Sequence, residues 1–242
     1  MKFLLILLFF TIHVLAADTA PIVNLSVAGI DDPAQFVKTI NIAVILALFV
    51  LAPTLILMVT SFTRIIIVFS LLRQALGLQT TPPTQIIISL SLILTIFIME
   101  PYAKKSWEEG ISPYMEQEIG YELAFERGIK PFKEFMIKNT RESDIALFYR
   151  IKKEPNPASI DDVPLTLLMP AFIVSELRTA FEIGILIFLP FLVIDIIVAS
   201  ILMSLGMMML PPVMISLPIK IIFFIVVDGW ALIIGNLAQS FK

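Results

Sequence analysis

Long apolar runs separated by shorter polar stretches dominate this chain of 242 residues. No charged residue occurs between Lys38 and Arg64, and we expect a first helical span at about 42–62 with a kink at Pro53. A second apolar segment is expected at about 84–99. Runs of this length with almost no charge are typical of helices that cross a bilayer.

The middle of the chain has a different character, because residues 104–162 hold more than half of the Lys, Arg, Asp and Glu residues. Apolar side chains recur there at helical spacing, which predicts short amphipathic helices packed on one another outside the lipid. An amphipathic helix is then expected from Pro164 to Glu182, followed by apolar segments at about 183–203 and 213–234.

The predicted fold class is therefore an all-α, membrane-associated protein built from helical hairpins. We expect an N-terminal hairpin within 18–103, a charged helical region at 104–162 and a C-terminal hairpin at 163–242. The last hairpin is expected to consist of two helices joined by a turn that is rich in methionine.

The first residues, MKFLLILLFFTIHVLAADTAP, have the layout of a secretory signal peptide at 1–17. A lysine precedes an apolar core and small residues at Ala16 and Ala17, where cleavage is expected. A retained first span is less favoured because this core is too short to cross a bilayer. Cleavage removes His13, the only histidine, and predicts that the 104–162 region is periplasmic and the methionine-rich turn cytoplasmic.

Composition supports a membrane protein and narrows the chemistry. The chain is 58% hydrophobic and 15% charged, whereas soluble domains average about 25% charged residues. A net charge of −3 gives no reason to expect nucleic-acid binding. The chain has no cysteine, and no Ser-Lys or P-loop motif stands out, so we expect neither an enzyme nor a metal or cofactor site.

Asp195 and Lys220 lie inside the apolar runs PFLVIDIIVAS and SLPIKIIFFIV. Such groups cost several kcal/mol in a membrane unless they are paired or hydrated. Folding the hairpin about residue 208 places the two at nearly the same depth, at about 1.5 Å per helical residue. They are either a structural ion pair or groups with a proton- or ion-linked role, and the second interpretation supports an alternative function as an ion-coupled membrane carrier.

The segment PAFIVSELRTAFEIG places Glu176, Arg178 and Glu182 on a semi-polar helix before the second hairpin. Arg178 and Glu182 are spaced i, i+4 and are able to pair locally. A solvated face and an inter-subunit or pore role remain alternative interpretations of the three residues.

The same segment, at 170–184, resembles a signature of the FliP family of flagellar biosynthesis proteins, which is shared with the R-type export proteins of injectisomes. A second segment, PFLVIDIIVASILMSLGMMMLPP at 190–212, is similar to the family's other signature, and LPIKIIFFIVVDGW after it also fits. The resemblance covers essentially the whole chain. The signal peptide and the long periplasmic segment favour the flagellar branch.

This resemblance implies a core subunit of the type III protein export gate, in the bacterial inner membrane and the flagellar basal body. Several copies, expected as a pentameric homo-oligomer, form a closed ring with Q-type and R-type subunits, and unfolded flagellar substrate proteins pass through its centre. Family membership also implies hairpins raised largely out of the bilayer, with much of the chain on the periplasmic side. No cofactor is implied.

The turn LMSLGMMMLPP gains a meaning from this resemblance. Methionine is unbranched and adaptable, so a run of it most often fills loose core or contacts lipid. The family is known for a methionine-rich gasket in the pore, and Met207, Met208 and Met209 match it. Gly206, Pro211 and Pro212 are expected to hold this loop in place.

Overall fold

The computed structural model describes residues 33–155, 157, 159, 162–207 and 209–241. The expected signal peptide with Ala16, Ala17 and His13 lies outside the described residues, as does Met208. The described residues form helices and no strands, so the predicted all-α class is confirmed. The chain divides into two units, Met1–Val50 and Leu51–Lys242, and each is considered by itself.

The first apolar segment forms helix α2 (Pro33–Met58), which contains Pro53. It begins and ends earlier than the expected 42–62. The stretch Val37–Met58 is long and apolar enough to cross a bilayer. Nearly all of its described side chains are exposed, which leaves an apolar surface for contact with lipid or with another protein.

Helices α3 (Phe62–Ala75) and α4 (Thr84–Ser106) follow and pack against each other. The turn between them begins at Gly77, whose φ of 79° favours glycine. Helix α4 passes through Pro101 and continues well beyond the expected end at 99. It runs into a π-helical turn, η1 (Trp107–Ile111), and the short helix α5 (Ser112–Met115).

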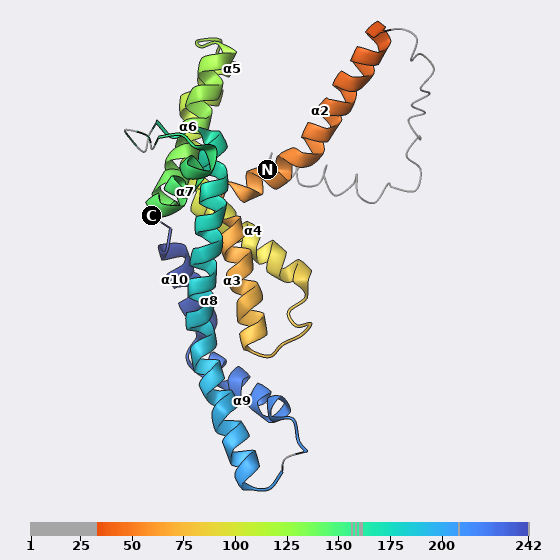
Figure 1. Ribbon diagram of the computed structural model, residues 1–242, viewed down its shortest axis with the longest axis vertical. Coiled ribbons are helices and arrows are strands. Elements are labelled where there is room, and N and C mark those ends of the chain that lie inside the picture. Colours follow the sequence, from red (N-terminus) through yellow and green to blue (C-terminus); the bar gives the residue numbers. More distant parts are fainter. Residues whose placement is uncertain (1–32, 156, 158, 160–161, 208, 242) are drawn as a thin grey trace. The chain divides into compact units, whose positions relative to one another are not determined.

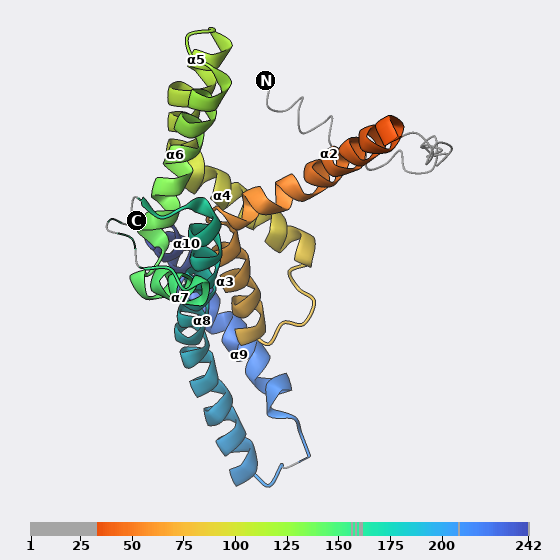
Figure 2. The same cartoon turned by 45° about the horizontal axis from the view of Figure 1, so that its top comes forward.

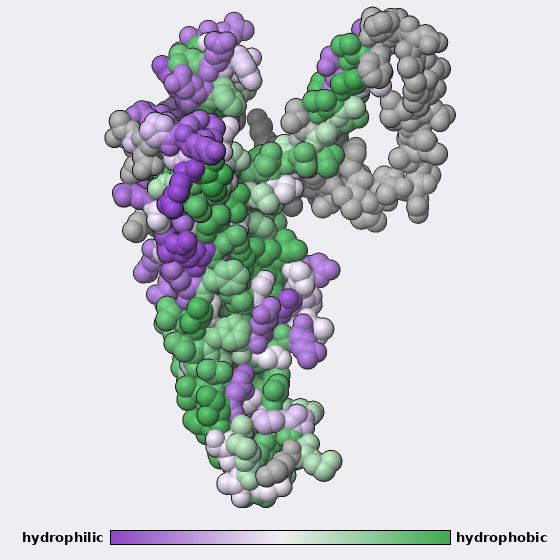
Figure 3. All heavy atoms as spheres, in the orientation of Figure 1, coloured by the Kyte–Doolittle hydropathy of each residue, from purple (hydrophilic) through white to green (hydrophobic). Residues whose placement is uncertain are grey.

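The charged middle region consists of α5, α6 (Tyr121–Asn139) and α7 (Glu142–Lys152). Hydrophilic side chains gather over these helices in Figure 3, whereas hydrophobic ones dominate the lower part of α8 (Leu165–Ser204). Buried side chains of α4, α6, α7 and α8 form one core, which includes Met99, Phe135, Tyr149 and Phe172. This core fixes the charged helices to the start of α8.

Helix α8 spans 40 residues without a break, although two separate segments were expected there. Pro170 and Pro190 lie inside it. The next expected segment, 213–234, is instead divided into α9 (Pro212–Val226) and α10 (Gly229–Gln239), which meet at a bend of 65°. Asp228, with a φ of 50°, occupies the bend.

Helix α8 organises the Leu51–Lys242 unit. Helix α3 packs along it, and α9 folds back against it (Figures 1 and 2). Two further cores join α3 to α8 and to the last two helices, through residues that include Ile65, Phe69, Leu72, Phe191 and Phe224. The methionine-rich turn therefore lies at one end of this unit and the α5–α6 hairpin at the other (Figures 1 and 2).

Candidate functional site

A buried ion pair joins α3 to α8. Arg64 donates from Nε to Oε2 of Glu176 at 2.8 Å and from Nη2 to Oε1 of the same carboxylate. The two side chains are 3% and 0% exposed. The third nitrogen, Nη1, donates to the carbonyl and the hydroxyl of Ser240, each at 2.9 Å.

The ring of Phe241 completes this site, because the guanidinium carbon of Arg64 lies 4.0 Å from its centroid. Every donor group of the guanidinium thus has a partner, and the two-point contact with a carboxylate is the strongest geometry open to arginine. The site ties α3, α8 and the C-terminal residues together. Sequence reasoning singled out Glu176 but placed Arg64 only at the end of a span.

The local pair expected between Arg178 and Glu182 is replaced by two ion pairs to other parts of the chain. Arg178 Nη2 lies 3.1 Å from Oδ1 of Asp144, and Arg141 Nη2 donates to Oε2 of Glu182 at 2.6 Å. Ser175 donates to the second carboxylate oxygen of Asp144 at 2.6 Å. The hydrogen bond to Glu182 raises the pKa of Arg141 above its ordinary value.

These contacts join Ser175, Arg178 and Glu182 of α8 to the start of α7, and both Ser175 and Asp144 are buried there. The backbone N–H of Arg141 also donates to Ser175 Oγ at 2.9 Å. Asp144 and Arg141 were not singled out from the sequence. They lie in a region read only as amphipathic, and nothing in its spacing relates them to α8.

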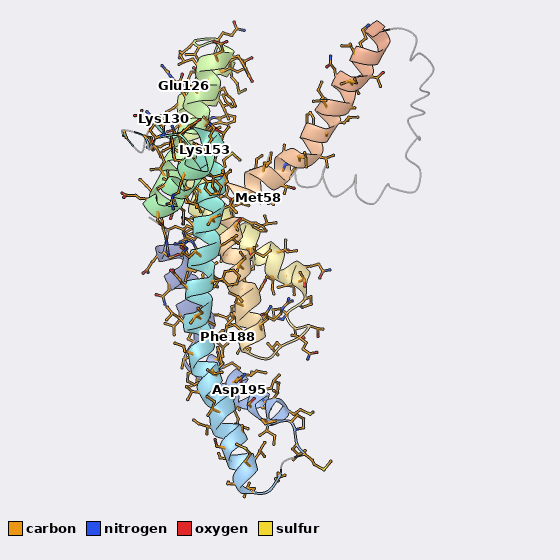
Figure 4. All side chains as sticks on the ribbon, viewed as in Figure 1. Met58, Glu126, Lys130, Lys153, Phe188 and Asp195 are labelled. Carbon is orange, nitrogen blue, oxygen red and sulfur yellow. The ribbon has the colours of Figure 1, made fainter. Side chains whose placement is uncertain are left out.

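The structure brings Asp195 and Lys220 together. Lys220 Nζ lies 2.6 Å from Asp195 Oδ2 and also donates to the carbonyl of Ala75 at 3.2 Å. Ser216 donates to the other carboxylate oxygen of Asp195 at 2.6 Å. Figure 4 labels Asp195 on α8 at the level where α9 lies beside it.

This pair is unequally buried, with the Lys220 side chain 5% exposed and that of Asp195 35% exposed. The ammonium is therefore held inside a three-helix contact of α3, α8 and α9, whereas the carboxylate reaches the surface. A charged group so enclosed is stable only while its partner and acceptors remain in place. The arrangement fastens the last hairpin to α3 at one depth.

The methionine-rich turn, residues 205–211, lies between the C-terminus of α8 and the first residue of α9. Gly206 has a φ of 74°, and the N–H of Met207 donates to the carbonyl of Leu202 at 3.0 Å, which is the usual closure of a helix C-terminus. Pro212 opens α9 at the first helical position, where its missing N–H costs nothing. Glycine and proline thus fix both sides of the turn.

The two described methionines of the turn, Met207 and Met209, are both exposed. Met207 is 43% exposed and Met209 is 98% exposed. An apolar side chain that is almost wholly exposed contributes little to the fold and is available to another molecule. Among the described residues, no group of three or more His, Cys, Asp or Glu side chains is placed to hold a metal ion.

Comparison with known proteins gives one consistent result. The sequence model of the FliP family matches residues 45–237. The chain is 50% identical over 210 residues to the flagellar biosynthetic protein FliP of Bacillus subtilis (strain 168), covering 87% of this chain and 95% of that protein. It is 50% identical over 203 residues to the protein of that name from Pectobacterium carotovorum subsp. carotovorum, covering 84% of this chain and 79% of that protein.

A third relative, the flagellar biosynthetic protein FliP of Caulobacter vibrioides, is 46% identical over 227 residues, with 93% of this chain and 84% of the relative covered. The matched region of the family includes α3, α4, the charged helices, the whole of α8 and α9, and the turn between these last two helices. Each of the ion pairs described above lies inside the matched region. The hydrogen bonds from Arg64 to Ser240 reach beyond its end at residue 237.

Proposed function

The chain belongs to the FliP family, and we propose that it is a core subunit of the flagellar protein export gate. In this proposal several copies surround a channel for unfolded flagellar proteins, and their methionine-rich turns close it when no substrate is present. The chain has no catalytic part in the process. Its working form is a ring, pentameric in copy number, assembled with Q-type and R-type subunits in the inner membrane and the flagellar basal body.

The observation that carries this proposal is the exposure of Met209, at 98%, on a turn held between Gly206 and Pro212. A rigid frame presents a flexible apolar side chain to whatever lies beyond the end of the hairpin. In a ring, the same side chain from every copy would meet near the axis. Methionine suits this position because it repacks readily around partners of different shape.

The outer faces of the last hairpin give further support. Many large apolar side chains of α8 are exposed, including Ile185, Leu186, Leu189, Val193 and Ile197. Figure 3 shows hydrophobic side chains covering this part of α8. An apolar surface of this extent is covered by lipid or by other subunits in the working protein, and neighbouring copies in a ring would cover it.

Orientation follows from the expected signal peptide. Cleavage would place the α5–α7 region in the periplasm and the methionine-rich turn toward the cytoplasm. The opposite positions of these two features within Leu51–Lys242 are compatible with that arrangement (Figures 1 and 2). Substrates would then meet the turn before they reach the charged helices.

Disulfide cross-linking tests the convergence of the turns directly, because the chain has no cysteine of its own. A Met209→Cys variant, expressed with its partner subunits and treated with a mild oxidant, should yield covalent dimers of the chain in intact membranes. An Ile151→Cys variant is the control, since Ile151 is 66% exposed but lies on α7. Cross-linking of the Met209→Cys variant no greater than that of the control would contradict the proposal.

A further inference from the structure

An apolar groove lies between α3, α4 and α10, and its lining includes no member of the ion pairs described above or of the methionine-rich turn. It encloses about 280 Å³. Its walls are almost entirely hydrophobic and come from residues that include Phe69, Leu76, Leu78, Leu90, Trp230 and Ile234. The groove opens to the surface, because Ile86 on its rim is 55% exposed and Trp230 is 42% exposed.

One charged residue, Arg73, lines this groove. Its Nη1 donates to the carbonyl of Pro82 at 3.4 Å and to the hydroxyl of Thr84 at 3.2 Å. Both acceptors are uncharged, and no carboxylate of the described residues forms an ion pair with this arginine. The start of α4 therefore holds the guanidinium in place without neutralising its charge.

We infer that this groove binds a membrane phospholipid, with an acyl chain along the apolar walls and the phosphate on Arg73. A guanidinium whose only acceptors are neutral favours an anion, and its planar donors match the oxygens of a phosphate. The combination of one cation and an apolar hollow fits an amphiphile better than a free anion. Two wall helices, α4 and α10, belong to segments apolar enough for the bilayer by length and composition, and together with the uncompensated charge of Arg73 this favours a lipid as the occupant.

The chain contains its own reporter for this site. Trp230 lines the groove, and Trp107 is the only other tryptophan. A Trp107→Phe variant of the full-length protein, purified in detergent, therefore has Trp230 as its sole fluorescent indole. Bromine atoms on a lipid acyl chain quench indole fluorescence only on contact, so titration with brominated phosphatidylglycerol measures occupation of the groove.

We expect saturable quenching by brominated phosphatidylglycerol and clearly weaker quenching by brominated phosphatidylcholine, whose headgroup has no net charge. Replacing Arg73 by Gln in the same background should raise the half-saturating lipid concentration by about tenfold, because a charge-assisted contact is lost. Arg150→Gln is the matched control: it removes the same charge from an exposed site on α7 and should leave the titration unchanged.

Several results would overturn the inference. Quenching that never saturates, or that is equal for the two lipids, would mean only general detergent-like contact. An Arg73→Gln titration identical to the control would remove the phosphate from Arg73. Displacement of the brominated lipid by inorganic phosphate alone would indicate a simple anion site, and a cross-link from a partner subunit into the groove in the assembled gate would show that protein fills it.

Discussion

The guanidinium of Arg64 and the carboxylate of Glu176 are separated by 112 residues of sequence and meet through two hydrogen bonds in the protein interior. The contact sets the position of α3 along α8, and Ser240 adds the C-terminal residues to it. The rest of the Leu51–Lys242 unit depends on this alignment, because two of its cores lie along the same pair of helices.

Removal of one member of this pair is therefore expected to be severe. Glu176→Ala leaves the charge of Arg64 buried without a carboxylate, which should lower the free energy of unfolding by about 3–5 kcal/mol. Thermal unfolding of the detergent-purified protein, followed by circular dichroism, measures the change. Lys104→Ala is the control, because Lys104 and Glu108 form an exposed pair 3.8 Å apart whose loss should barely move the Tm.

A double variant separates loss of the charge pair from loss of packing. Arg64→Met combined with Glu176→Leu replaces both charges by apolar side chains, and it should recover much of the stability lost in Glu176→Ala. If the double variant is instead as unstable as the sum of two single losses, the pair does not act as a unit.

The unequal burial of Asp195 and Lys220 predicts unequal effects. Asp195→Ala would leave the ammonium of Lys220 enclosed with the carbonyl of Ala75 as its remaining acceptor, which should cost about 3–5 kcal/mol. Lys220→Ala should cost less, about 1–2 kcal/mol, since Asp195 keeps its hydrogen bond from Ser216 and reaches the surface. Unfolding midpoints and swimming motility both report the order.

The double alanine variant at these positions should be no worse than Asp195→Ala alone. Asp228→Asn is a suitable control, because it also removes a carboxylate from the last hairpin, at an exposed bend where asparagine tolerates the positive φ. Strictly additive losses, or a larger effect of Lys220→Ala, would show that the two residues act separately.

The crossing of η1 and α6 offers a contrast between two glycines. A Cβ on Gly110 would lie 2.7 Å from the backbone of Gly128, so Gly110→Ala must push the two elements apart and should cost about 1–3 kcal/mol. A Cβ on Gly128 meets only Ser106 Oγ at 3.6 Å. Gly128→Ala should therefore stabilise α6 by up to about 1 kcal/mol through helix propensity.

Thermal unfolding of the two variants and the wild type tests these predicted changes in stability. Opposite shifts of the Tm are expected, with Gly110→Ala below the wild type and Gly128→Ala at or above it. A Tm for Gly110→Ala at or above that of the wild type would mean that the close approach of the two backbones is not maintained in solution.

Much of the fold was accessible from the sequence, because apolar runs and helical spacing report directly on helices. The depth of Asp195 and Lys220 could also be estimated, since both lie on one hairpin with a recognisable turn. The unbroken course of α8 could not be, because the change after Glu182 from a semi-polar to an apolar sequence was read as a boundary between two segments. The bend at Asp228 was missed for the opposite reason: its flanks are apolar throughout.

The contacts of Arg64, Asp144 and Arg141 were beyond sequence reasoning for a simpler reason. Each joins helices that are far apart along the chain, and helical periodicity relates only residues within a few turns of one another. Even the i, i+4 rule was misleading for Arg178, whose spacing to Glu182 permits a local pair while tertiary packing supplies Asp144 instead.

The central claim, that the methionine-rich turn seals a channel, is tested most directly by ion conductance across planar bilayers containing the purified assembly. Met207→Ala, Met208→Ala and Met209→Ala combined should leave the assembly size unchanged, because the described side chains of the turn contribute little packing. The account predicts that wild-type assemblies are closed to small ions, that the triple alanine variant conducts, and that a triple leucine variant conducts less. Intact alanine-variant assemblies that remain as ion-tight as the wild type would contradict it.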